Sequence, residues 1–252
     1  TRKIKRSLYD FLKAYSNLEL LDYNRPQTGC FSHVIDDKRY LFRLSVMENF
    51  VIKTAVLRLL NLASFHDLKE CVQDDQVYRK LKELSQLDHG LILFCGPTGS
   101  GKSTTLFYFL KSLKGRQCYC LDNPIEMYDS DLVQIEVGKY LKLDDALQQL
   151  LRHDPDVIAF GEIRNELELS SLRKAALSGH FVCASIHAQQ LPDLFARLYD
   201  LGASHYEIYH LLKGAVFQKM RWDDEKKKPI VSFDIYTSME IQEKIIFETK
   251  HP

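Results

Sequence analysis

One short segment constrains the fold more strongly than any other part of the chain. Residues 96–104 read Gly-Pro-Thr-Gly-Ser-Gly-Lys-Ser-Thr, which matches the G-x-x-x-x-G-K-[ST] pattern of a phosphate-binding P-loop. The apolar run at 91–95 before it is typical of a buried strand, and residues 103–113 after it favour a helix. A strand, a glycine-rich turn and a helix in this order predict an α/β fold.

The residue types in this loop point to its ligand. Its glycines allow consecutive backbone N–H groups to turn inward on to phosphate oxygens, and the following helix presents its positive end to the same anion. Lys102 would reach the β- and γ-phosphates of a nucleotide, and the Ser103 hydroxyl would bind Mg²⁺. A glycine-rich turn that binds nothing is the alternative, which the flanking strand and helix disfavour. The predicted nucleotide-binding residues are Gly96, Pro97, Thr98, Gly99, Ser100, Gly101, Lys102, Ser103 and Thr104.

The rest of the pattern predicts two domains. Further apolar runs at 117–121, 157–160 and 181–186 alternate with helical segments at 143–152 and 166–178. This alternation predicts a mainly parallel sheet that is covered on both faces. Before it, residues 30–35 and 39–46 flank a polar turn and read as a hairpin, 54–60 as a third strand, and 66–87 as a helical stretch broken once. We therefore expect a small β-rich α/β domain at 1–87 and a larger α/β domain at 88–252.

A second motif follows one of the predicted strands. Residues 153–164 read His-Asp-Pro-Asp-Val-Ile-Ala-Phe-Gly-Glu-Ile-Arg, so an apolar run ends close to the carboxylate of Glu162. A P-loop enzyme needs a carboxylate at such a strand end, either to hold Mg²⁺ or to polarise the attacking water. A purely structural strand is the alternative, and the P-loop in the same chain favours the functional interpretation.

Composition and charge exclude several classes of protein. Lys plus Arg equals Asp plus Glu at 34 each, whereas a protein that binds nucleic acid through its phosphates usually carries a basic excess. No apolar run approaches the roughly 18 residues of a membrane span, and no signal peptide is evident. The six cysteines lack C-x-x-C spacing and read as reduced core thiols rather than zinc ligands. We expect a cytoplasmic protein that does not bind nucleic acid directly.

These motifs together resemble those of the ATPases that drive type II secretion and type IV pili. The segment 153–164, Ala-Ala-Leu-Ser-Gly-His-Phe-Val at 175–182 and Ser-Ile-His-Ala at 185–188 are similar to the Walker B and His-box regions of that family. Gln218-Lys219-Met220-Arg221 resembles its Q-R-L-x-R run, and segments near residues 26–29 and 43–59 resemble its N-terminal domain. The resemblance implies a RecA-like P-loop domain, ATP and Mg²⁺ as ligands, and a homohexamer.

The resemblance also implies roles for particular residues. Glu162 matches the Walker B glutamate and would act in catalysis and at Mg²⁺. His180 and His187 match the two His-box histidines, the first with the nucleotide and the second as a sensor of the γ-phosphate. Arg43 and Arg58 match arginine fingers, which reach the γ-phosphate from the small domain. Without the family context, a lone histidine would more often be a core residue, and the arginines would be surface residues.

One motif departs from the family pattern. The Asp box usually reads E-D-P-[VI]-E, and here it reads Asp122-Asn123-Pro124-Ile125-Glu126. The Asp122 carboxylate reaches about 1.5 Å less far than that of a glutamate, and a misplacement of that size can slow a reaction about a hundredfold. We predict that Asp122 orients the attacking water, that Glu126 is a possible substitute, and that hydrolysis is slow.

Two absences bear on the subfamily. The region after the His box lacks the tetracysteine zinc subdomain of secretion and pilus-extension members, and the last 31 residues lack the A-I-R-N-L-I-type helix of retraction members. The chain is therefore most similar to the competence ATPases of Gram-positive bacteria, which power a DNA-uptake pilus. That placement implies a position at the inner face of the cell membrane, on a polytopic inner-membrane platform protein, with membrane contact only through this partner. A secretion or retraction ATPase and a weakly active nucleotide-binding scaffold are the alternatives.

Overall fold

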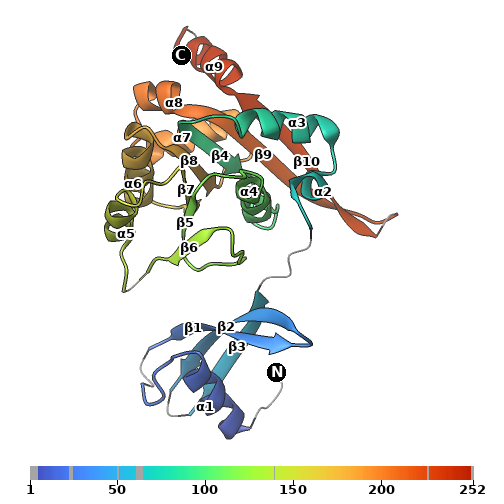
Figure 1. Ribbon diagram of the computed structural model, residues 1–252, viewed down its shortest axis with the longest axis vertical. Helices are drawn as coiled ribbons and strands as arrows, with labels where there is room; N and C mark the ends of the chain where they lie inside the picture. The colour runs from blue at the N-terminus through green and yellow to red at the C-terminus, as the bar shows by residue number, and fades with distance from the viewer. Residues whose placement is uncertain are drawn as a thin grey trace. The chain divides into compact units, whose positions relative to one another are not determined.

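The chain forms two compact units, Thr1–Ala63 and Ser64–Pro252. The computed structural model describes residues 5–22, 25–49, 51–60, 65–138, 140–225 and 227–250 (Figure 1). The sequence placed the boundary at 87/88, and the contacts place it 24 residues earlier. The reason is that helices α2 (Leu68–Val72) and α3 (Asp75–Leu84) bury their apolar side chains in the core of the larger unit.

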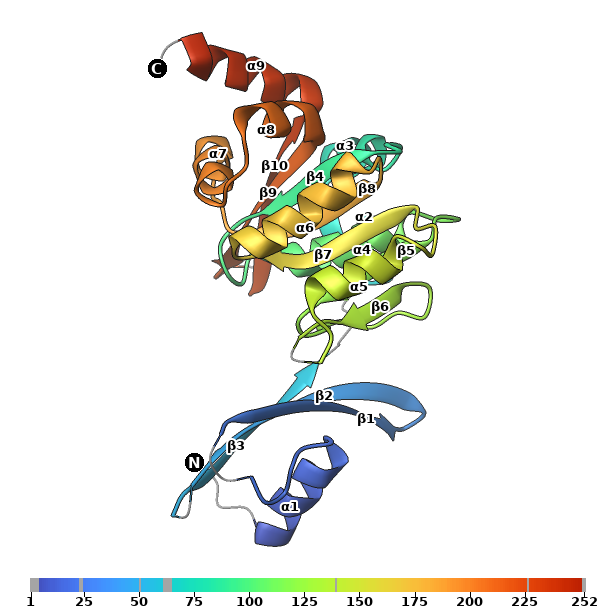
Figure 2. The same ribbon diagram turned by 90° about the vertical axis from the view of Figure 1, so that its left-hand side faces the viewer.

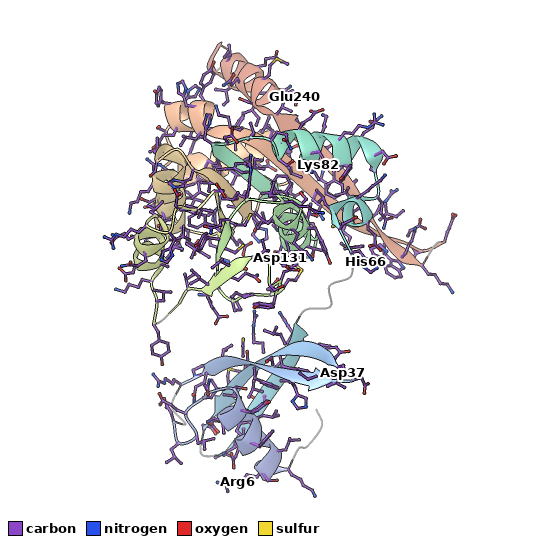
Figure 3. The ribbon with its side chains drawn as sticks, viewed as in Figure 1. Arg6, Asp37, His66, Lys82, Asp131 and Glu240 are labelled. Carbon is purple, nitrogen blue, oxygen red and sulfur yellow. The ribbon has the colours of Figure 1, made fainter. Side chains whose placement is uncertain are left out.

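The smaller unit is an antiparallel sheet with one helix against it. Strands β1 (Gln27–Ile35), β2 (Lys38–Glu48) and β3 (Lys53–Leu60) lie in the order β1-β2-β3. Asp36 and Asp37, with φ of 50° and 60°, form the two-residue turn between β1 and β2 (Figure 3). The predicted hairpin and third strand are confirmed.

Helix α1 (Arg6–Tyr15) is fixed to this sheet by packing and by a buried ion pair. Tyr9 packs with Leu44 and Val46 in a small core. Lys13 forms an ion pair with Glu48, and both side chains are fully buried. Burial, followed by the Glu48 charge, raises the pKa of Tyr9 to about 12, so this phenol stays neutral beside the ion pair.

The larger unit is built on a sheet in the order β10-β9-β4-β8-β7-β5-β6 among the described residues. Its strands are β4 (Gly90–Cys95), β5 (Cys118–Asp122), β6 (Val133–Glu136), β7 (Val157–Ile163), β8 (Phe181–Ile186), β9 (Leu212–Asp223) and β10 (Lys228–Thr237). Every pairing is parallel except that of β10 with β9. The central strands β4 and β8 are buried along their whole length, which explains their unbroken apolar runs.

Helices cover both faces of this sheet (Figure 2). On one face, α2, α3 and α4 (Lys102–Lys111) share a core with the strands. The other face is covered by α5 (Leu143–Leu150), α6 (Glu166–Leu177), α7 (Leu191–Asp200), α8 (His205–Leu211) and α9 (Ser238–Lys250). The predicted α/β fold with a mainly parallel sheet covered on both faces is thus confirmed.

The parallel arrangement positions the motifs. The carboxyl ends of β4, β5, β7 and β8 lie at one edge of the sheet, and the P-loop, the Asp box, Glu162 and His187 stand at or just beyond these ends. Ligands of open parallel sheets bind at this edge. Within the described residues, no helix has the length and apolarity that a membrane crossing needs.

Candidate nucleotide-binding site

The P-loop adopts a conformation that depends on glycine at its first residue and at the start of its helix. Gly101 has φ of 88° and caps the N-terminus of α4, so that Lys102 is the first helical residue. A Cβ on Gly96 would lie 2.3 Å from the backbone oxygen of Gln218 in β9. The loop therefore folds tightly against β9, and its backbone and the helix N-terminus form an anion-binding cradle.

Lys102 is held inside this cradle. Its Nζ donates hydrogen bonds to the backbone oxygens of Gly96, at 2.8 Å, and of Pro97, at 3.1 Å. Burial lowers the pKa of Lys102, and the nearby Glu162 charge opposes that shift. The side chain is only 7% exposed. A cation positioned this way over the loop fits a phosphate group as its partner.

Glu162 is fixed by two neighbours. Nε of Arg164 donates to Oε2 of Glu162 at 2.6 Å, and Nε2 of His187 lies 2.6 Å from Oε1. The hydrogen bond to Glu162 is the main cause that raises the pKa of Arg164. Two residues that the sequence assigned to one site, Glu162 and His187, are thus in direct contact, although they belong to different strands.

A β-bulge in β7 sets the direction of Glu162. Phe160 pairs with Ala184 and Glu162 pairs with Ser185, so Gly161 is the extra residue. The Ser185 hydroxyl donates to the backbone oxygen of Gly161 and stabilises the bulge. Because side chains alternate along a strand, one inserted residue moves Glu162 to the other face.

Asp122 lies against this bulge from the neighbouring strand β5. A Cβ on Gly161 would lie 1.8 Å from Oδ1 of Asp122, so only glycine leaves room for this carboxyl group. The backbone N–H of Asn123 donates to Oδ1 at 2.8 Å. Burial, assisted by the charges of Glu126 and Glu162, raises the pKa of Asp122 to about 6. A carboxyl group with a pKa near 6 is suited to accept a proton near neutral pH.

Two small cavities connect these residues. Ser103, Asp122 and Glu126 line one of about 50 Å³, with Phe160 and Gly161 at its wall. Asp122 and Glu162 line the adjacent cavity of about 60 Å³. The predicted Mg²⁺ hydroxyl and all three predicted carboxylates are thus gathered at the same edge of the sheet.

A larger cavity of about 650 Å³ lies beside Gly101 and Thr104, at the start of α4. Its walls include Val72, Met220 and Ile230 from other parts of the larger unit. Within the loop, the Ser100 hydroxyl is buried and has no partner among the described residues. The cradle, the cation and this half-apolar cavity fit a nucleoside triphosphate.

The residues present also fit Mg²⁺. This ion keeps several waters and takes few protein ligands, because substrate phosphates supply the others. Ser103 and the neighbouring carboxylates offer such a set. The described part of the chain has no cluster of three or more His, Cys, Asp or Glu side chains suited to a metal, and its six cysteines are free thiols.

His180 does not join this site. It precedes β8, and its backbone oxygen accepts from Gly90, the first residue of β4, so it lies at the opposite edge of the sheet. Its Nδ1 lies 3.3 Å from the backbone oxygen of Ala175. The six residues of β8 separate it from His187 by about 20 Å. The expectation that His180 stands with the nucleotide in this unit is not supported by its position.

The two predicted arginine fingers lie side by side in the smaller unit. Arg43 of β2 and Arg58 of β3 are direct cross-strand partners. Arg58 is exposed. Nε and Nη2 of Arg43 are buried and have no hydrogen-bond partner among the described residues. Of the two side chains, Arg58 is therefore the one that is open to an approaching anion.

Sequence reasoning missed three residues that shape the site. Gly161 and Ser185 build the bulge, and Gln218 contacts the P-loop from β9. Gly161 stood within the quoted Phe-Gly-Glu segment and Gln218 within the Gln-Lys-Met-Arg run, but nothing local to either segment indicated its contacts.

Comparison with known proteins identifies the family. The model of the Type II/IV secretion system protein family matches residues 1–243. The chain belongs to this family. The predicted kinship with secretion and type IV pilus ATPases is confirmed.

Individual relatives carry related names. The putative type II secretion system protein E of Escherichia coli K12 is 32% identical over 227 residues, which cover 87% of this chain and 45% of that protein. Competence protein ComGA of Streptococcus pneumoniae is 31% identical over 214 residues, which cover 82% of this chain and 66% of that protein. The chain thus spans about half the length of the first of these relatives and about two thirds of the second.

Solved structures agree on the fold. The ATPase DotB of Legionella pneumophila matches with a TM-score of 0.79 at 18% identity, over 98% of this chain and 73% of that one. The pilus retraction motor PilT with bound ADP matches with a TM-score of 0.72 at 25% identity, over 98% and 72%.

Proposed function

We propose that this chain binds Mg²⁺-ATP at the P-loop and hydrolyses it, and that hydrolysis drives assembly of a type IV-like pilus for DNA uptake. One observation carries the enzymatic part. The P-loop lysine, the Ser103 hydroxyl and the carboxyl groups of Asp122 and Glu162 converge at one edge of the sheet. A purely structural loop would not require a buried lysine, a hydroxyl and two carboxyl groups at the same edge of the sheet.

Each residue has a task that follows from its position. Lys102 would bind the β- and γ-phosphates, and the loop backbone would hold their oxygens. Ser103 and Glu162 would hold Mg²⁺, which neutralises charge on the transferring phosphoryl group. Asp122 would orient the attacking water and accept its proton at the carboxylate, with Glu126 as the neighbouring alternative. His187, which contacts Glu162, would link that carboxylate to the end of β8.

The smaller unit would complete the site in an assembled ring. Arg43 and Arg58 stand opposite each other on adjacent strands, and an arginine finger stabilises charge on a transferring phosphoryl group. We propose a homohexamer in which these arginines serve as fingers. Its motion would act on a polytopic platform protein of the inner membrane, so the protein would be cytoplasmic and would contact the membrane only through that partner.

The competence role is supported by relatives named ComGA. This chain covers 66% of the length of one of them, compared with 45% of the length of the type II secretion relative. A type II secretion or pilus retraction ATPase remains the second candidate, because relatives and a solved structure carry those names too. A weakly active scaffold is the third, and the altered Asp box favours it.

The enzymatic part is tested by Lys102→Ala. This change removes the cation of the P-loop, and we expect hydrolysis to fall at least a hundredfold while the fold is kept. Lys114→Ala, at an exposed lysine beyond the end of α4, is the matched control and should leave the rate unchanged. The measurement is phosphate release with and without Mg²⁺. A Lys102→Ala variant that keeps a third of the rate would refute the site.

The biological part is tested in the host. Deletion should abolish uptake of transforming DNA, and the gene with Lys102→Ala should fail to restore it. A deletion strain that transforms normally but fails to secrete proteins would favour the secretion role. Full restoration by Lys102→Ala would favour the scaffold.

A further inference from the structure

Gln218 occupies a special place on β9. Phe217 pairs with Cys95, the last residue of β4, so Gln218 stands beside the first residue of the P-loop. It is the last buried residue of β9, at 3% exposure, and the four residues that follow it, 219–222, are exposed. Figure 1 shows the β9–β10 hairpin extending past its neighbouring strand from this region.

The side-chain amide of Gln218 joins two parts of the P-loop motif. Its Nε2 donates to the backbone oxygen of Ser100 at 2.6 Å, and its Oε1 accepts from the Thr105 hydroxyl at 2.8 Å. Ser100 lies in the loop itself, whereas Thr105 lies in the first turn of α4 and is 1% exposed. Both bonds are therefore shielded from water, which cannot easily replace them.

The packing around the amide is close. A Cβ on Gly101 would lie 2.7 Å from Nε2 of Gln218, and a Cβ on Gly96 would lie 2.3 Å from its backbone oxygen. The backbone of Gln218 therefore packs against Gly96 at the start of the loop, and its side chain packs against Gly101 near the end of the loop. An amide is the group that can donate at one end and accept at the other without carrying a charge.

We propose that Gln218 is a positioning residue that fixes the P-loop in its phosphate-binding conformation. This inference rests on the proposed function of the same site. The amide holds the Ser100 carbonyl turned away from the phosphate position, so that the loop N–H groups stay directed inward. It also ties this conformation to the β9–β10 hairpin, whose residues Met220 and Ile230 line the cavity beside the loop.

Removal of the amide should weaken nucleotide binding more than turnover. Gln218→Met keeps the length of the side chain but breaks both hydrogen bonds. We expect the Kd for ADP to rise about tenfold, which is about 1.4 kcal/mol. The KM for ATP should rise similarly and kcat should stay within about threefold, because the loop holds phosphate in ground and transition states alike. Lys219→Met, at the exposed neighbour, is the matched control and should change neither constant.

Gln218→Glu separates positioning from general stability. A carboxylate can accept from Thr105 but repels the Ser100 carbonyl, whereas the protonated acid restores the donor. Because burial raises the pKa of a carboxyl group, ADP affinity relative to wild type should recover between pH 8 and pH 6. At each pH, the Kd for ADP of Gln218→Glu is divided by that of wild type, because other titratable groups near this residue affect both proteins alike. These groups are Cys71, Asp74, Lys102, Lys219 and Lys228.

Thr105→Val provides an independent variant if the changes at Gln218 prevent folding. It removes the hydroxyl and keeps the shape, so it should raise the Kd for ADP in the same direction. Combined with Gln218→Met, it should add little, because both changes break the same bond. ADP binding is measured by calorimetry on protein whose fold is checked by circular dichroism.

The outcomes distinguish two failures. If wild-type protein binds no ADP, the proposed function fails. If wild type binds ADP and Gln218→Met or Thr105→Val binds equally well, or if Gln218→Glu shows no recovery at low pH, only the role of Gln218 is refuted.

Discussion

Asp122 should weaken the fold at neutral pH while it supports the chemistry. Its carboxyl group is buried against Gly161, and burial raises its pKa from 3.8 to about 6. Asp122→Asn is nearly isosteric, and its amide oxygen can still accept from the Asn123 N–H. The variant therefore removes a buried charge and keeps the contacts.

The sign and size of the effect follow from the pKa. The pKa of the Asp122 carboxyl is 3.8 in the unfolded chain and about 6 in the folded chain. The free energy of unfolding therefore falls as the pH rises from about 4 to about 6. The full difference is about 3 kcal/mol above pH 7, at 1.36 kcal/mol per pKa unit. At pH 5 the difference is about 1.5 kcal/mol, and it falls to about 0.1 kcal/mol at pH 3. Asp122→Asn should recover this stability and lose at least nine tenths of the ATPase rate.

Scanning calorimetry is the suitable assay, because the chain has two compact units and Asp122 lies in the larger one. We expect the transition of that unit to rise by roughly 5–10 °C at pH 7.5 and by about half as much at pH 5. The transition of the smaller unit serves as the internal control and should not move. A variant that is less stable than wild type at pH 7.5, or a gain that is equal at both pH values, would refute the buried-carboxylate reasoning.

Two further predictions concern the division of labour in catalysis. If Asp122 orients the water, Asp122→Glu should hold or raise kcat, and Glu126→Gln should lower kcat only slightly. A severe loss of kcat in Glu126→Gln alone would transfer the role to Glu126. The measurement is steady-state phosphate release. Arg43→Ala and Arg58→Ala should each lower hydrolysis at least tenfold and leave ADP affinity within a few-fold, and each should inhibit when mixed with wild type. Unchanged hydrolysis in both single variants would remove these arginines from the mechanism.

The parts of the structure that the sequence predicted well are those that depend on residues close together along the chain. The P-loop, the strand before Glu162 and the helix broken near residue 73 each depend on neighbours in sequence: Gln73 ends α2 with φ of 57°, and the Asp74 side chain caps α3. Gly179, with φ of 88°, follows the end of α6, where a glycine in the left-handed conformation commonly ends a helix. Such features are predictable because they need no distant partner.

Tertiary packing decided what the sequence did not predict. No element was expected at residues 191–211 or beyond 222, yet α7, α8, β10 and α9 form there. In α9, burial of Ile241 and Ile245 against the sheet compensates for a sequence with little amphipathic pattern. The domain boundary moved for the same reason, since the sequence assigned the helical stretch at 66–87 to the small domain and only the core contacts of α2 and α3 place it in the larger unit.

Within the site, the residues were predictable and their relations were not. Glu162 and His187 were each placed at a strand end, but their contact depends on the bulge at Gly161. His180 was grouped with His187 by motif, although the length of β8 puts it at the other edge. A motif fixes residue types along the chain, and the sheet decides which edge each residue reaches.

The altered Asp box acquires a physical reason from the bulge. The sequence suggested that Asp122 is a glutamate cut short, with its carboxylate set back from the water. In the structure, the backbone of Gly161 comes so close that Oδ1 occupies the space where a side chain at 161 would begin. The Asp122 carboxyl thus packs directly against the bulge that sets the direction of Glu162, and the carboxyl groups of Asp122 and Glu162 line one cavity. Burial, together with the charges of Glu126 and then Glu162, raises the pKa of Asp122 to about 6, which favours proton acceptance near neutral pH. If Asp122 accepts a proton from the attacking water, as we propose, its shorter side chain loses reach but has a pKa closer to neutral pH.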